Sequence, residues 1–228
     1  MRRVTGLFER ALGEEWDELH PQTRDRYGLV AAQNREAVGT GEMHRLSRHP
    51  LALPVLWLGT VEDFFFPERG TDVPFSITSE AFVDGNGNEA LFLRRHFETD
   101  PPRAFVDTLR WNPARGCITD LFGRNGRVAA DLHLGVDGGD LVLTLGEQWL
   151  RVGGRYVPLR GPLAVSADLY DRYDDDAEEF RVDAEISNPL IGRVFAYEGA
   201  FESEFRPVDV AQTTSSSLGG VGLPGENA

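Results

Sequence analysis

Apolar and polar side chains alternate along the last strongly patterned stretch of the chain, from Phe180 to Phe201. Every second residue over 180–186 is apolar, and the residues between them are charged. A period of two is typical of a half-buried strand. The pattern stops at Asn188-Pro189 and resumes after Gly192. We therefore predict that this stretch forms the closing strand pair of an antiparallel sheet.

Similar extended segments begin at Val73 and recur with turn residues between them. The clearest turn signal, Asp84-Gly85-Asn86-Gly87-Asn88, is typical of a hairpin. The expected strands are Pro74–Val83, Leu91–Phe97, Arg103–Trp111, Cys117–Phe122, Arg127–Gly135, Asp140–Arg151, Arg155–Leu159, Leu163–Tyr173 and the two closing strands. We predict a β-dominated α+β fold, in which about 8–10 strands form a curved antiparallel sheet or a partly closed barrel.

The part of the chain before these strands has helical spacing instead. Leu7, Leu12, Trp16 and Leu19 share one face of a helix that starts after Thr5. We expect two or three N-terminal helices within about 5–66 and the sheet within about 73–205, in a single domain of residues 1–206. The remaining segment, 207–228, is rich in Gly and Ser, and we predict that it is a disordered tail.

The charge of the chain limits the environments and the binding partners that we expect for this protein. The net charge is −14, from 37 acidic and 23 basic residues, and every basic residue is arginine. An acidic surface adapted to a high-salt cytosol, as in halophilic archaea, explains this composition, and so does a GC-rich genome that favours arginine codons. We favour the first explanation, adaptation to high salt, and therefore expect the protein to fold only in molar salt. A chain with no basic stripe is not expected to bind nucleic acid.

The N-terminus and the longest apolar run predict the location of the protein. No uninterrupted apolar segment of the kind found in secretory signals follows Met1. The longest apolar run, Leu51–Val61, is too short to span a bilayer and contains Pro54 and Gly59. We therefore expect a soluble cytoplasmic protein without stable membrane insertion.

Two predicted strands carry charged residues on their apolar faces. Arg95 lies on the same face as Leu93 and Phe97, and Asp107 lies on the apolar face of the next strand. A hairpin that pairs Phe97 with Arg103 places Leu93 opposite Asp107. Arg95 then becomes a diagonal neighbour of Asp107, within reach of a long side chain.

A second aspartate, Asp120, lies on the apolar face of the following strand. Buried charges are costly unless they are paired, so the cluster is either an internal ion pair that fixes strand register or the polar floor of an apolar pocket. We favour the ion pair slightly and keep both. The candidate ligand-binding residues are Arg95, Asp107, Asp120, Phe97, Trp111 and Tyr197.

Other motifs carry little chemistry. The GxGxxG match at Gly220–Gly225 has no strand before it and no room for a helix after it, so it is a chance match. The acidic run Asp171–Glu179 lacks the glycine of a calcium loop and reads as a solvated turn. His44 and His49 do not have the spacing of zinc ligands. No cofactor and no metal are therefore expected, and the catalytic residues, if any, are not identified.

Several short motifs resemble the domain-of-unknown-function family numbered 4166, whose members are sometimes fused to saccharopine-dehydrogenase-like domains. Leu93 stands where the family has Trp, and Asp120 where it has Glu. The resemblance covers roughly 6–205 and implies the fold more than an activity. The matching residues are Gly39–Met43, Arg95, Phe97, Gly123, Val157–Leu159, Ile186, Pro189, Gly192, Tyr197 and Gly199.

Three functions remain open. The leading hypothesis is non-catalytic binding of an apolar or amphipathic small molecule inside the curved sheet, with Arg95 facing an acidic or carbonyl head group. The alternative is a hydrolase- or isomerase-like enzyme acting on a hydrophobic acid or lactone, with Asp107 or Asp120 as general base. The third is a protein-interaction module that uses the acidic outer face. The question of whether the protein is an enzyme stays open, and we favour a protein without catalytic activity.

Overall fold

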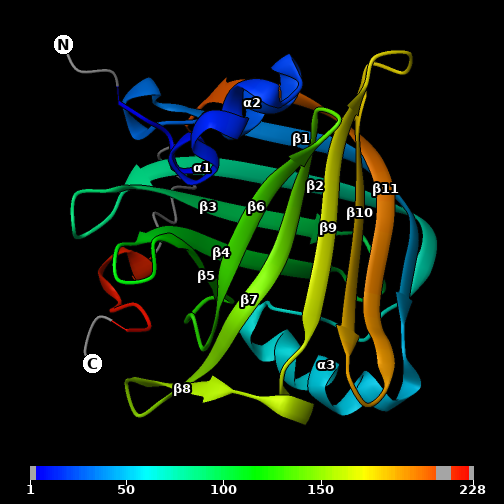
Figure 1. Ribbon diagram of the computed structural model, residues 1–228. Coiled ribbons are helices and arrows are strands. Elements are labelled where there is room, and N and C mark those ends of the chain that lie inside the picture. Colours follow the sequence, from blue (N-terminus) through cyan, green and yellow to red (C-terminus); the bar gives the residue numbers. More distant parts are fainter. Residues whose placement is uncertain (1–3, 209–216, 226–228) are drawn as a thin grey trace.

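Ten antiparallel strands close into a barrel in the computed structural model, which describes residues 4–208 and 217–225 (Figure 1). The order of neighbouring strands is β6-β5-β4-β3-β2-β1-β11-β10-β9-β7, and pairing of β6 with β7 closes the ring. The strands are β1 Arg35–Arg48, β2 Gly70–Val83, β3 Glu89–Phe97, β4 Arg103–Asn112, β5 Cys117–Phe122, β6 Val128–Asp137, β7 Asp140–Val152, β8 Arg155–Leu159, β9 Ser166–Asp174, β10 Glu179–Asn188 and β11 Gly192–Pro207. The predicted β-dominated fold is confirmed, with β8 as an extra strand outside the ring.

Short helices cover both ends of the barrel, as Figure 1 shows. Two of them, with a 3-10 helix between them, precede β1 and lie at one end of the barrel. The third lies between β1 and β2, at the opposite end of the barrel. The α-helices are α1 Leu7–Leu12, α2 Pro21–Tyr27 and α3 Leu53–Gly59, and the 3-10 helices are η1 Gly13–Glu18, η2 Ala31–Gln33, η3 Pro50–Ala52, η4 Thr60–Glu62, η5 Gly161–Leu163 and η6 Ser217–Gly220. Among the described residues, no helix is long and apolar enough to cross a membrane.

The predicted closing strand pair is confirmed. Phe180 of β10 pairs with Phe201 of β11, and Ile186 pairs with Phe195. All four side chains are buried and belong to one aromatic-rich core.

The helical region expected over about 5–66 is wrong where β1 lies. The inner face of this strand carries Ala37, Gly39 and Met43, which gives almost no apolar alternation. Gly41 allows β1 to approach β11 closely, because a Cβ there would lie 2.1 Å from the carbonyl oxygen of Ala200. A register shift between Glu42 and Arg45 then disturbs the period further. Because of these small inward-facing residues and the bulge, the sequence pattern did not predict this long strand.

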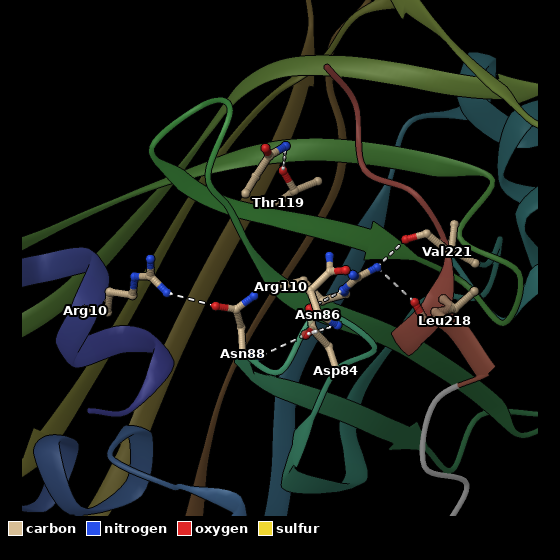
Figure 2. A network of polar contacts seen from close by, with 9 residues as sticks. Arg10, Asp84, Asn86, Asn88, Arg110, Thr119, Leu218 and Val221 are labelled. Atoms are coloured by element: carbon tan, nitrogen blue, oxygen red, sulfur yellow. Dashed lines mark hydrogen bonds and ion pairs between the residues drawn. The ribbon is translucent and has the colours of Figure 1, made fainter. Parts of the chain in front are cut away.

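Part of the predicted disordered tail is folded. Leu218 and Leu223 are buried against the outside of the barrel. The guanidinium of Arg110, on the outer face of β4, donates to the carbonyl oxygens of Leu218, at 3.1 Å, and of Val221, and its Nε donates to Asp84 at 3.0 Å (Figure 2). The prediction of disorder is thus wrong for 217–225, whereas 209–216 and 226–228 lie outside the described residues.

The ring of strands has a seam between β7 and β9. These strands pair only over Leu141–Thr144, after which β7 pairs with β8 instead. Across the seam the side-chain amide of Gln148 replaces the backbone ladder. It donates to the carbonyl oxygen of Val165 at 2.5 Å and accepts from the Val165 amide at 3.0 Å.

Candidate functional site

An apolar cavity of about 100 Å³ lies inside the barrel. Residues from most strands line it, together with Phe8 of α1, Tyr27 of α2 and Phe65, which follows η4. A cavity of about 150 Å³ is known to hold one benzene molecule. The present cavity therefore accommodates a ligand of a few heavy atoms, or several waters.

The polar side of this cavity is an ion pair between β3 and β4. Arg95 Nη1 donates to Asp107 Oδ2 at 2.7 Å, and both side chains are largely buried. The pairing of Leu93 with Asp107 and of Phe97 with Arg103 confirms the predicted hairpin register. The diagonal contact follows from that register.

A second carboxyl group, Asp120 of β5, completes the cluster. Asp107 pairs with Phe122 and Leu109 pairs with Asp120, so the two aspartates are diagonal neighbours on one face. Burial, and then the charge of Asp107, raise the pKa of Asp120 well above its ordinary value, although Arg95 acts in the opposite direction. Burial also raises the pKa of Asp107, but its ion pair and hydrogen bond with Arg95 act in the opposite direction, so Asp120 is the carboxyl of the two that more readily keeps a proton.

Each aspartate keeps one oxygen without a partner. Oδ1 of Asp107 and Oδ1 of Asp120 are buried and accept no hydrogen bond from the described residues. Both aspartates line the cavity. Because an unpaired buried polar atom costs about 1–3 kcal/mol, these oxygens favour a polar group in the cavity, either water or a ligand atom.

The six candidate residues divide into two sets. Arg95, Asp107, Asp120 and Tyr197 line the cavity together. Burial raises the pKa of the Tyr197 phenol, so this side chain is a neutral hydrogen-bonding group. The other two residues lie away from the cavity lining. Phe97 packs 4.9 Å from the ring of Phe66, and Trp111 carries the guanidinium of Arg10 at 4.1 Å from its ring centroid.

Sequence reasoning missed a second polar pair in the barrel. The Tyr27 hydroxyl, at the cavity lining, donates to Asp171 Oδ2 at 2.5 Å. Asp171 is buried, and burial raises its pKa. Asp171 lies on the same strand face as Leu169 and Tyr173, and this pattern could have indicated an inward-facing aspartate. The interpretation of Asp171–Glu179 as a solvated turn left this pattern out of account. Only the later part of that run forms the turn between β9 and β10.

The cluster is not arranged as a metal site. Within residues 4–208 and 217–225 no three His, Cys, Asp or Glu side chains gather closely enough to hold a metal ion. The chemistry available here is that of one guanidinium, two carboxyl groups and one phenol. This set can donate and accept hydrogen bonds and can exchange a proton.

The fold and site define a closed antiparallel barrel with a small interior cavity and a buried Arg–Asp–Asp cluster. The sequence matches the family described as "Domain of unknown function (DUF4166)" over residues 19–201, and the chain belongs to this family. It is 29% identical over 206 residues to "Uncharacterized protein YndH" of Bacillus subtilis (strain 168), covering 89% of this chain and 99% of that protein.

A comparison of structures gives no further guide. The dehydratase domain of PpsC from Mycobacterium tuberculosis, solved in complex with C12:1-CoA, aligns with a TM-score of 0.18 and 7% identity. The alignment covers 72% of this chain and 76% of that one, and at this TM-score it carries no argument.

Proposed function

We propose that the barrel binds one small amphipathic molecule, whose polar group meets Arg95, Asp107 and Asp120. The observation that carries this proposal is the pair of unpartnered buried carboxyl oxygens at an otherwise apolar cavity. A ligand site of this kind combines apolar walls with a few convergent polar groups. The cavity of about 100 Å³ limits the ligand to a short chain or one small ring.

The charges in the cluster favour a neutral head group. Asp107 already compensates the charge of Arg95, and the raised pKa of Asp120 favours the neutral form of that carboxyl group. An anionic head group would add an uncompensated charge to a desolvated site, which is costly. A carbonyl or hydroxyl group can instead accept from Asp120 or Arg95, and a hydroxyl can also donate to Asp107.

Mass spectrometry of a solvent extract from purified protein tests this proposal. We expect one small amphipathic compound in stoichiometric amount, or stabilisation by C3–C5 ketones and alcohols in a thermal-shift series. Arg95→Met should abolish either signal, whereas Arg94→Met, whose side chain lies on the outer face of the same strand, should retain it. An empty extract together with no thermal shift from any of these compounds would overturn the proposal.

A second candidate function is general acid–base catalysis on a hydrophobic acid or lactone. It is favoured by the raised pKa of Asp120 next to Asp107, which is paired with Arg95, a combination typical of sites that move protons. Asp107 makes a single hydrogen bond to Arg95, so it is not held in a bidentate pair. In this case Asp120→Asn should remove turnover of a lactone substrate without removing its binding, since the amide keeps the shape but cannot transfer a proton.

A further inference from the structure

Five large apolar side chains are exposed within eleven residues around α3. Leu51, Val55, Trp57, Leu58 and Val61, which we call the α3 surface, are between 56% and 73% exposed. Ala52 and Leu56 on the other side of the same segment are buried in the core. A helix that is apolar on all sides is normally covered on all sides. The α3 surface is therefore expected to have a covering partner.

Other exposed apolar residues lie at the same end of the barrel. Leu163 of η5 and Leu190 of the β10–β11 turn are each 72% exposed. Asn188 links these two segments by donating to the carbonyl oxygens of Pro162 and Ala164, both at 2.9 Å. The amide of His49, just before η3, donates to Val194 of β11 at 3.0 Å. The apolar area thus extends from α3 across adjoining loops.

The charge of the molecule is distributed unevenly between the two ends of the barrel. At the α3 end, the exposed arginines Arg69, Arg155 and Arg160 have no carboxylate partner within the described residues, although three exposed acidic residues, Asp72, Glu98 and Asp100, lie at the same end. The opposite end, with α1, η1 and the β9–β10 turn, carries exposed acidic residues: Glu14, Glu15, Asp17, Glu18, Asp175, Asp176 and Glu178. A strand of ten residues is about 33 Å long. Since the Debye length is about 8 Å at physiological salt, the acidic end hardly affects a surface that touches the α3 end.

We propose that the α3 end docks on the headgroup region of an anionic phospholipid bilayer. The apolar residues would enter the boundary between headgroups and acyl chains, and the arginines would meet the lipid phosphates. Trp57 has the side chain preferred at this boundary, and the guanidinium of Arg103 lies 5.6 Å from its ring centroid. Docking of this kind is peripheral and needs no helix that crosses the bilayer.

The docked segment is continuous with the wall of the cavity. Phe65 lies three residues after the end of η4 and lines the cavity, and its ring lies 5.4 Å from that of Phe105. Glu62 anchors this segment to the β5–β6 turn through Arg127 at 2.7 Å and Asn125 at 2.8 Å. The docking proposal does not depend on a ligand in the cavity, and its test measures lipid binding alone.

Flotation with lipid vesicles tests the proposal. Vesicles of phosphatidylcholine are compared with vesicles of phosphatidylcholine and phosphatidylglycerol at 3:1, at molar KCl and at the lowest KCl concentration at which circular dichroism shows the chain to be folded. We expect the full chain to bind the anionic vesicles at least tenfold more tightly at low salt, with a blue shift of Trp57 emission that Trp57→Phe removes. The double variant Val55→Asp/Leu58→Asp should lose at least tenfold in affinity at both salt concentrations.

Matched variants separate the apolar and electrostatic parts. Arg155→Glu/Arg160→Glu should weaken binding roughly fivefold for each arginine at low salt only. Val83→Asp, an exposed apolar position at the opposite end, and Arg24→Glu on α2 should bind like the unmodified chain. No flotation of the unmodified chain would overturn the proposal. So would a dimer in sedimentation velocity that Val55→Asp/Leu58→Asp dissociates without any vesicle binding, because the partner would then be a second copy.

Discussion

Replacing Arg95 by methionine should leave a buried carboxylate without its cation. The side chain of Arg95 is 12% exposed and that of Asp107 is 3% exposed, at an N–O distance of 2.7 Å. Breaking a buried pair by removing one partner costs about 3–5 kcal/mol. We expect a loss of about 3 kcal/mol, because Asp107 can take up a proton in the variant.

The pH dependence of this loss has a definite sign. Without Arg95, burial raises the pKa of Asp107 further, so the folded variant binds a proton that the unfolded chain releases above about pH 3.9. The unfolding free energy of Arg95→Met should therefore fall more steeply with rising pH than that of the unmodified protein. Urea unfolding followed by circular dichroism, at one fixed salt concentration between pH 5 and 8, measures both curves.

Two further variants make the measurement decisive. Arg95→Met/Asp107→Leu removes both charges and should recover to within about 1 kcal/mol of the unmodified protein, since apolar replacements of buried pairs are often neutral. Arg94→Met, on the outer face, should change stability by no more than about 0.5 kcal/mol. If Arg95→Met matches Arg94→Met at every pH, the pair is not a buried ion pair in solution and the argument from burial fails.

The remaining predictions concern three other positions, each checked by equilibrium unfolding. Asp120 has a raised pKa, so the stability that its neutral form contributes is complete below about pH 3.9 and is lost as the pH rises through its folded-state pKa. Asp120→Asn should thus gain about 1–3 kcal/mol at pH 8 but not at pH 4, and a gain independent of pH would contradict this assignment. Leu218→Ala should cost about 2–4 kcal/mol because Leu218 is buried, and a neutral result would mean that 217–225 does not dock. Gly41→Ala should cost at least about 1–3 kcal/mol, since its Cβ would lie 2.5 Å from the Cα of Phe201. Gly220→Ala, where a Cβ meets nothing within 4 Å, is the control, and equal stability of the two would refute the close approach of β1 and β11.

Part of the candidate site could be predicted from the sequence, because turn residues and side-chain alternation there indicate the same pairing of strands. The β3–β4 hairpin has both signals, so the register that joins Arg95 to Asp107 could be worked out before the structure. Side-chain alternation shows on which face of a strand a residue lies, but not how far along the barrel axis it lies. Trp111 and Phe97 were therefore assigned to the site, although neither side chain is among those that line the cavity.

Long-range contacts explain what could not be predicted. The glycines of β1 are needed because β11 lies against them, a constraint that exists only after the barrel has closed. The segment 217–225 has a composition typical of disorder, and the side chains that hydrogen-bond to it, Arg110 and Asn112, lie more than a hundred residues earlier in the sequence. Neither relation has a local signature.

The seam between β7 and β9 has a consequence for the motion of the barrel. Two hydrogen bonds from one side chain, Gln148, hold Val165 where a row of backbone hydrogen bonds would otherwise be needed. A side-chain rotamer change takes far less time and free energy than the separation of two paired strands. Water and small solutes could thus exchange with the interior through this point while the rest of the ring stays intact. The Val165 amide should accordingly exchange its hydrogen much faster than the amides of β10.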